Sequence, residues 1–310
     1  SKLNKQMKEI PLEKFIEELD QEIKQTQKDH QLAVSLERLK EIAKIYQGED
    51  RIVSSLELAE EMKTRPEEKK YHSGWTDFDG IISGFRPQQL ITIAGPTKNG
   101  KTSFAMDLSN RFKDHNPLWF PFEEGAEELI QKFLERGMEV PLFYTPKTML
   151  GNTFLWLEKK LIESIAKHDS KMVFIDHLHF IIPPSEERQD LKIGEAMREL
   201  KRMAKKWNVI IFILAHLKKT KIDTNPDLED LRDSSFIAQE SDTVIMLWRE
   251  TKRENKEVVI TNNLTVSIQA NRRTGKTGNV KMTYDGMKFI EYDWSREANE
   301  TRAKNEFERY

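Results

Sequence analysis

The residue pattern with the most specific chemical meaning is a glycine-rich stretch that matches GxxxxGK[ST], the spacing of phosphate-binding loops. Its glycines let successive backbone amides point at phosphate oxygens, and the helix expected after it adds partial positive charge. We expect Lys101 to neutralise the β- and γ-phosphates of ATP and the Thr102 hydroxyl to bind Mg²⁺. The expected nucleotide loop comprises Gly95, Pro96, Thr97, Lys98, Asn99, Gly100, Lys101, Thr102 and Ser103.

Carboxylates that could complete such a site follow two other apolar runs. The run at 171–175 ends in Asp176, which we expect to hold the Mg²⁺ through a water. The run at 116–122 is followed by Glu123 and Glu124; Glu123 is the candidate for orienting the attacking water, and Glu124 is the alternative. His177 and His179 come next to Asp176 and form a conceivable metal-binding pair, but no third ligand is evident in the sequence.

The elements that must position these residues begin near residue 72, where strand and helix patterns alternate. Apolar runs at 90–95, 116–122, 172–176, 209–216 and 242–248 read as buried strands, and amphipathic stretches separate several of them. This alternation predicts an α/β fold with a mostly parallel sheet and helices on both faces. Three further segments, 264–270, 279–285 and 287–293, read as an antiparallel extension of that sheet.

The first 70 residues have a different pattern, rich in Glu, Lys and Gln. Apolar stripes predict helices over 12–23 and 32–46, and a third helix beginning at Ser54 with a capping-box Glu57. We therefore expect a helical N-terminal segment over 1–70, an ATPase domain over 71–295 and a charged tail over 296–310. The helical segment is either a bundle or spacer, or an element that docks onto a neighbouring subunit.

Composition excludes several classes of protein. The 310 residues contain no cysteine, which rules out disulfide frameworks, cysteine nucleophiles and iron–sulfur clusters. No apolar run approaches the ~18 residues of a membrane span, and a cytoplasmic location is the simplest expectation. The 50 Lys and Arg against 52 Asp and Glu give a net charge of -2, so nucleic-acid binding must be local.

The motifs, in their order, resemble the hexameric replicative DNA helicases of the DnaB type over about residues 72–294. The similarity is greatest to the phage ring helicase-primases and the Twinkle-type helicases. It is carried by the phosphate loop, FEEGAEEL at 122–129, ILAHLKK at 213–219, DLRDSSFIAQESDTVIMLWRE at 230–250 and NRRTGKTG at 271–278. The resemblance implies a RecA-like P-loop NTPase core and an ATP-dependent helicase that unwinds duplex DNA.

The same resemblance implies roles for further residues. It makes Glu123 the catalytic glutamate and His216 the sensor of the γ-phosphate. NRRTGKTG would supply an arginine finger to the neighbouring subunit's site, either Arg272 or Arg273, with Arg272 favoured. Arg249 and Tyr284 would sandwich the adenine base.

The expected track is single-stranded DNA passing through a homo-oligomeric ring, which we expect to be hexameric. The contacts would come from two loops that contain Arg188, Lys218, Lys219 and Lys221. A primase or DNA polymerase, in the same chain or separate, is the expected partner. The chain is then a short helicase or the helicase portion of a longer polypeptide. The expected location is a bacterial or phage-infected cytoplasm, with mitochondria or another organelle as the alternative.

Two other functions share this set of motifs. A RecA- or RadA-like recombinase or mediator has the same core, although the DLR and NRRTG segments argue against it. A helicase-loading module would bind nucleotide without productive turnover, but the complete set of Lys, Asp and Glu argues against that. The sequence does not distinguish an RNA track from a DNA track.

Overall fold

The computed structural model describes residues 52–137, 139–182, 189–217, 226, 235–254 and 257–292, together with residues 17 and 21. Several sequence predictions fall outside these residues. They are the helix over 32–46, all of the helix over 12–23 except residues 17 and 21, the tail over 296–310, and the DNA contacts Arg188, Lys218, Lys219 and Lys221.

The chain divides into two compact units, Ser1–Glu67 and Glu68–Tyr310. In the first unit, helix α4 spans Ser55–Thr64 and confirms the third predicted helix. The Ser54 hydroxyl caps it by accepting a 3.1 Å hydrogen bond from the Glu57 amide, as the capping-box spacing predicts. Its apolar side chains are largely solvent-exposed, with Leu56 at 79% and Met62 at 63%.

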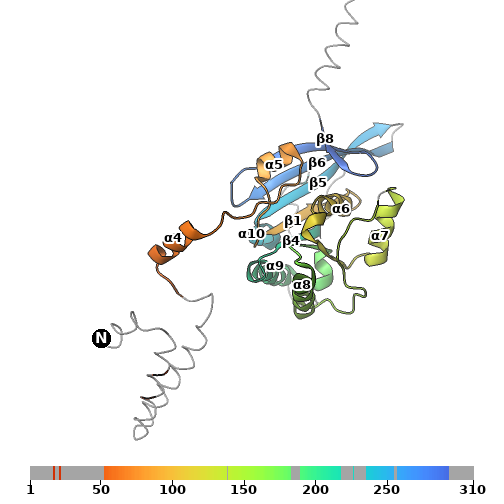
Figure 1. Ribbon diagram of the computed structural model, residues 1–310. Coiled ribbons are helices and arrows are strands. Elements are labelled where there is room, and N and C mark those ends of the chain that lie inside the picture. Colours follow the sequence, from red (N-terminus) through yellow and green to blue (C-terminus); the bar gives the residue numbers. More distant parts are fainter. Residues whose placement is uncertain are drawn as a thin grey trace, which may run out of the picture. The chain divides into compact units, whose positions relative to one another are not determined.

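The second unit is built on an eight-stranded sheet in the order β2-β3-β4-β1-β5-β6-β7-β8 (Figure 1). The first five strands in that order are parallel, and β5 to β8 are antiparallel. The predicted parallel sheet with an antiparallel extension is therefore confirmed. The strands are β1 (Leu90–Gly95), β2 (Leu118–Pro121), β3 (Met172–Asp176), β4 (Ile210–His216), β5 (Thr243–Glu254), β6 (Glu257–Asn271), β7 (Gly278–Tyr284) and β8 (Phe289–Glu291).

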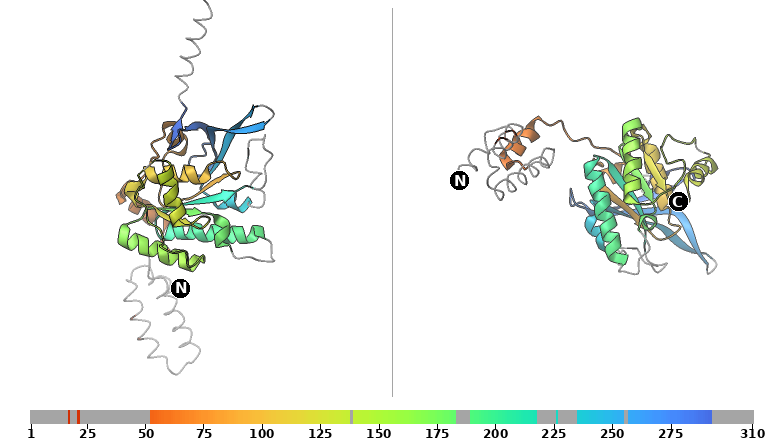
Figure 2. Two further views of the ribbon diagram at one scale, coloured as in Figure 1. Left: turned by 90° about the vertical axis from the view of Figure 1, so that its right-hand side faces the viewer. Right: turned by 90° about the horizontal axis from the view of Figure 1, so that it is seen from below.

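Helices cover both faces of this sheet (Figure 2). None of the helices within the described residues is long and apolar enough to cross a membrane. The helical elements of the second unit are α5 (Thr76–Ile82), α6 (Lys101–Arg111), η1 (Lys113–His115), α7 (Ala126–Glu135), α8 (Phe154–His168), η2 (Leu178–Ile181), α9 (Gln189–Lys206) and α10 (Ser235–Glu240).

Alternate residues of β3 and β4 pack in two separate hydrophobic cores. In β4, Phe212 packs in the core that contains residues of α5, α6 and α7, whereas Ile211 and Ile213 pack in the core that contains residues of α8 and α9. This follows from the two-residue period of a strand, which sends successive side chains to opposite faces. Because both faces are covered, the strands are apolar throughout, which is why they appear as continuous apolar runs in the sequence.

The antiparallel part of the sheet is longer than the sequence predicts. Strand β5 continues to Glu254 and β6 begins at Glu257, whereas the apolar runs span only 242–248 and 264–270. The additional residues pair with each other, for example Thr251 with Ile260. The added part of β5 is polar, and the apolar run VVI at 258–260 of β6 is too short to predict a strand by itself, so the sequence pattern does not reveal the extension.

The core on the α6 side is stabilised by stacked aromatic rings. Phe212 of β4 stacks on Phe174 of β3 with ring centroids 4.6 Å apart, and Trp119 of β2 stacks on Phe174 at 4.8 Å. All three side chains are fully buried. The stacked rings thus connect β2, β3 and β4, which are neighbours in the sheet.

We expect Phe212→Ala to lower the free energy of unfolding by about 3–5 kcal/mol, because it removes buried surface and leaves a cavity between stacked rings. Phe180→Ala is the matched control, since Phe180 is 45% exposed, and it should cost less than about 1 kcal/mol. Denaturant unfolding followed by circular dichroism measures both. Equal losses in the two variants would contradict this account of the core.

Candidate active site

The phosphate loop connects β1 to α6 through backbone conformations that favour glycine. Gly100 caps α6 with φ of 85°, and Lys98 also has positive φ, at 64°. At the start of the loop, a Cβ on Gly95 would meet the Leu247 carbonyl oxygen at 2.4 Å, so only glycine fits between β1 and β5. The helix then begins directly at Lys101, with its amides facing the loop.

The Lys101 ammonium is folded back onto the loop. Its Nζ donates hydrogen bonds of 2.9 Å to the carbonyls of Gly95 and Pro96, and the residue is only 5% exposed. Burial lowers the pKa of Lys101 to about 8, against the pull of the nearby Asp176 and Glu123 carboxylates. A bound phosphate would favour the charged form, so this lysine has a direct electrostatic reason to attract one.

Thr102 and Asp176 meet at the end of β3. The Thr102 hydroxyl donates a 3.0 Å hydrogen bond to Asp176 Oδ2, and Asp176 is 5% exposed. Burial raises the pKa of Asp176 to about 6, and the neighbouring Glu123 and Glu124 carboxylates add to the effect. A hydroxyl and a carboxylate at one point are the oxygen ligands that Mg²⁺ prefers, and a cation there would favour the ionised Asp176.

Glu123 lies in the turn after β2, beside the same strand ends. Its amide donates to the Asp176 carbonyl at 3.1 Å, and its Oε2 is 3.7 Å from Nε2 of His216. Glu124 forms an ion pair with Lys132 of α7 instead. Of the two predicted carboxylates, Glu123 is therefore the one directed toward the other candidate residues.

His216 ends β4 and lies between the loop and Glu123. Its register partner in β1 is Gly95, and its Nδ1 is 3.4 Å from the Thr97 hydroxyl. Burial lowers the pKa of His216 to about 4, and the charged Lys101 contributes. The imidazole is therefore neutral at neutral pH and free to exchange hydrogen bonds on both sides.

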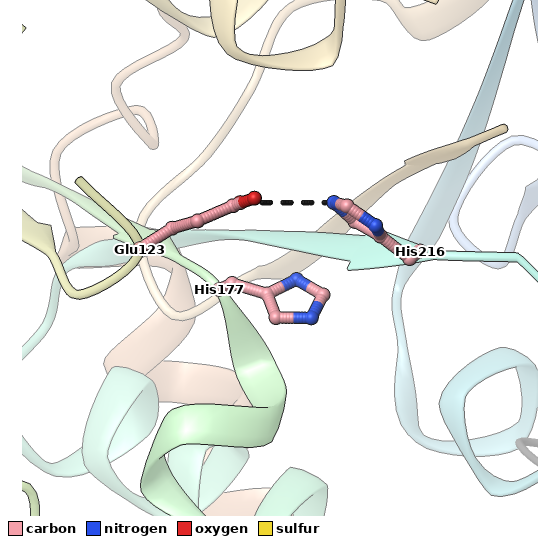
Figure 3. A group of neighbouring side chains, drawn as sticks. All are labelled: Glu123, His177 and His216. Atoms are coloured by element: carbon pink, nitrogen blue, oxygen red, sulfur yellow. Dashed lines mark ion pairs between the residues drawn. The ribbon is translucent and has the colours of Figure 1, made fainter. Parts of the chain in front are cut away.

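His177 joins this group from the end of β3. Its ring approaches that of His216 edge-on, with centroids 4.2 Å apart (Figure 3). Strand β3 ends at Asp176, so His177 and His179 do not share the face of a continued strand; instead their rings stack at 4.8 Å. His177 groups instead with Glu123 and His216, which with it each offer an atom within 4.8 Å of the others, and His179 is not part of this group.

Arg249 and Tyr284 line one pocket of about 280 Å³ next to the phosphate loop. The Arg249 amide donates to Oδ1 of Asn99 at 2.8 Å, and its guanidinium donates to Asn262. The Tyr284 hydroxyl donates to the Gly286 carbonyl at 2.6 Å. The pocket is lined by Asn99, Gly100, Ser103, Arg249, Asn262, Leu264, Tyr284, Gly286 and Phe289.

Arg136 is a residue of this pocket region that the sequence did not suggest. Its guanidinium donates a 2.7 Å hydrogen bond to the Ser103 hydroxyl and lies 5.6 Å from the centre of the Tyr284 ring. It directly follows α7, where an arginine is common because it interacts favourably with the helix dipole. No local pattern distinguishes it from such a capping residue.

Arg272 and Arg273 lie at the opposite end of the strands from the phosphate loop. The Arg272 amide donates to the Asp242 carbonyl, and the Asp242 amide donates to the carbonyl of Leu90, each at 2.8 Å. Leu90 begins β1 and the loop follows its end, about 17 Å away at ~3.3 Å per residue. Neither arginine therefore reaches the phosphate loop of its own chain.

The two arginines differ in their contacts. The Arg273 guanidinium forms an ion pair with Glu68, which also pairs with Arg86 at 3.0 Å. The Arg272 side chain is exposed and has no ion pair within the part of the chain that the structure describes. Arg272 is therefore the more available of the two for a group outside this chain.

The buried Asp176 carboxyl makes the nucleotide-free protein pH-sensitive. Its pKa in the folded state, about 6, exceeds the usual aspartate value, so the folded state holds its proton to higher pH than the unfolded chain. The free energy of unfolding therefore falls as pH rises from about 4 to 6, by about 3 kcal/mol. We expect Asp176→Asn to be more stable than wild type by that amount at pH 7, with the difference vanishing near pH 4.

Thermal unfolding without nucleotide or divalent cation measures this difference. The control is Asp285→Asn, because two backbone amides bound to the exposed Asp285 carboxylate lower its pKa. Its replacement should not stabilise the protein at pH 7. A destabilised Asp176→Asn protein at pH 7 would contradict the prediction.

Comparisons with known proteins agree with this geometry. A family model described as the DnaB-like helicase C terminal domain matches residues 71–152 and 148–292. The replicative DNA helicase DnaB of Leifsonia xyli subsp. xyli (strain CTCB07) is 27% identical over 250 residues, which is 69% of this chain and 54% of that protein. The chain thus spans about half the length of the curated relatives it matches.

Two solved structures share the fold. One, described as an ATPase domain, matches with a TM-score of 0.64 and 21% identity, covering 77% of this chain and 97% of that one. A DnaB-like replicative helicase, solved in a study of its interactions with primase, matches with a TM-score of 0.66 and 19% identity, covering 91% and 76%. The predicted RecA-like fold class is confirmed, and the chain belongs to the DnaB-like helicase C-terminal domain family.

Proposed function

We propose that this chain is the ATPase motor of a ring-shaped DNA helicase, which translocates on single-stranded DNA and unwinds duplex ahead of a replication fork. The observation that carries the proposal is the meeting of Lys101, Thr102, Asp176 and Glu123 at one edge of the sheet. Family membership over residues 71–292 supports the choice of a helicase among the proteins that share such an edge.

In this proposal the chain holds Mg-ATP mainly through the phosphate loop. Lys101 exchanges its bonds to the Gly95 and Pro96 carbonyls for the β- and γ-phosphates, and the amides at the start of α6 bind the remaining oxygens. Thr102 and Asp176 would hold Mg²⁺, which neutralises charge on the phosphates when it is bound. Arg249 and Tyr284 would hold the adenine in the adjoining pocket, supported by their common lining of it.

Hydrolysis then requires Glu123 to orient a water toward the γ-phosphate. His216 contacts both Thr97 of the loop and Glu123, so movement of the loop or its ligand changes the contacts of His216. The chain continues from His216 into the predicted DNA-contacting loop with Lys218, Lys219 and Lys221. That connection gives a short covalent route from the nucleotide to the DNA.

The remaining catalytic group would come from a neighbouring subunit. Arg272 is exposed and lies too far from the phosphate loop of its own chain, so a closed ring brings it to the next one. Such a ring, of six subunits in our proposal, makes hydrolysis depend on assembly. The exposed Leu56 and Met62 of α4 support a docking role for the segment 1–70 between subunits.

We infer that the working assembly includes single-stranded DNA, contacted by Arg188 and the three loop lysines, and a primase. The structural relative solved in a study of its primase interactions supports the second partner. The bacterial replicative helicase relative supports a cytoplasmic location in a bacterial or phage-infected cell.

Steady-state ATP hydrolysis with and without single-stranded DNA tests the proposal, with Lys101→Ala as the blank. We expect DNA to stimulate hydrolysis and the specific rate to rise steeply with protein concentration. Glu123→Gln should bind ATP normally but lose at least about 10²-fold in kcat, because only the water-orienting carboxylate is removed. Glu124→Gln is the matched control and should retain activity.

Duplex unwinding on a forked substrate is the decisive assay. ATP binding without any hydrolysis in the assembled protein would contradict the motor and favour a nucleotide-binding loading module. Strand exchange without unwinding would favour a recombinase. Stimulation of ATP hydrolysis by RNA but not by DNA would indicate that the protein moves along RNA.

The two arginines give a separate prediction. Arg272→Ala should lower kcat by ~10³, the usual contribution of an arginine finger, while oligomer formation is preserved. Arg273→Ala should act mainly through its ion pair with Glu68, so it should lower activity much less. Mixing Arg272→Ala subunits with Lys101→Ala subunits should restore activity at mixed interfaces, and no restoration would contradict action between subunits.

A further inference from the structure

We propose that Glu123, His177 and His216 form a binding site for a zinc-class transition-metal ion, and that this ion inhibits the protein when bound. The site is distinct from the Mg²⁺ position at Thr102 and Asp176. The binding part of the proposal stands on the geometry of the three side chains. The inhibition rests additionally on the proposed function, because it depends on the role of Glu123.

The three residues come from the ends of three strands and converge on one point (Figure 3). Glu123 follows β2, His177 follows β3 and His216 ends β4. One ligand atom from each lies within 4.8 Å of the others, and His216 Nε2 is already 3.7 Å from Glu123 Oε2. A tetrahedral zinc site with bonds of about 2.0–2.1 Å spaces its ligands by ~3.3 Å. Small adjustments of the three side chains would bring the ligand atoms to this spacing, and Glu123 is 39% exposed.

The ligand chemistry selects the class of metal. Two imidazole nitrogens and one carboxylate are a donor set of zinc sites that keep a fourth position open. Mg²⁺ prefers oxygen ligands and octahedral geometry, so it should not compete strongly here. The two sites of this edge therefore differ in preference, with oxygen ligands at Thr102 and Asp176 and nitrogen ligands at His177 and His216.

The His177 imidazole is free to adjust its position at this site. The buried Nδ1 of His177 has no hydrogen-bond partner within the described residues, so no bond of that atom holds the ring against a small adjustment. His179 stacks on His177 but offers no atom to the group of three.

Occupation of this site would separate nucleotide binding from hydrolysis. A metal ion bound to Glu123 would withdraw charge from the carboxylate and hold it toward the two histidines, so it would orient a water less well, and a metal-bound His216 would no longer contact the loop in the same way. Lys101 and Thr102 are not ligands of this site and stay available for the phosphates. Zinc should therefore reduce kcat while ATP still binds.

Metal binding is tested directly with Co²⁺, which absorbs visible light in such sites, on the full chain without nucleotide. We expect one Co²⁺ per chain with a visible band that Zn²⁺ removes. His177→Asn and Glu123→Gln should each weaken binding by about tenfold or more, because each removes a ligand. His179→Asn is the matched control and should bind as wild type does.

Circular dichroism checks that His177→Asn is folded, and Glu123→Gln provides a second test at an exposed side chain. Absence of the visible band in wild type would overturn the proposal, as would an equal loss of affinity in His179→Asn. Zn²⁺ should also lower ATP hydrolysis in excess Mg²⁺, reversibly on adding a zinc-selective chelator. Co²⁺ binding by a chain that hydrolyses no ATP would refute the motor alone, whereas DNA-stimulated hydrolysis without metal binding would refute the metal site alone.

Discussion

The alignment of strand ends is the constraint on which the rest of this structure depends. Because β1 to β4 run parallel and in register, Gly95 lies opposite His216 and Pro121 opposite Asp176. The polar groups that follow these four strands therefore emerge at one edge of the sheet. A shift of one residue in any of these pairings would turn the apolar side chains of that strand to the other face, so the two cores enforce the register that the site needs.

The ionisable groups gathered at that edge lower the stability of the folded protein. Burial lowers the pKa of Lys101 and His216 and raises that of Asp176, so it favours the neutral form of each group. These shifts reflect the free-energy cost of holding ionisable groups out of water. Phosphates and a divalent cation are the ligands that would reverse the shifts of Lys101 and Asp176. The electrostatics of the site therefore favour binding of a charged ligand. The stacked aromatic rings of the core contribute stability that offsets the cost of burying these groups.

The phosphate loop and the two arginines proposed to act between subunits lie at opposite ends of the sheet. The phosphate loop follows the carboxyl ends of the parallel strands, while Arg272 and Arg273 lie beside Asp242 at their amino ends. A residue at one end cannot serve a ligand at the other within one chain. Subunits arranged head to tail around a ring bring the opposite ends of neighbours together, which is the geometry that the family resemblance suggested.

The phosphate loop, the strand-end Asp176, the α/β alternation and the Ser54 cap could be read from the sequence, because each depends on residues adjacent in the chain. The sequence favoured Glu123 over Glu124 without excluding the second, and it did not reveal the grouping of His177 with His216 or the contact of Arg136 with Ser103. Each joins residues on different elements, or depends on where a strand ends and which way a side chain then turns. Local spacing determined the phosphate chemistry, whereas the packing of the strands decided which side chains share the site.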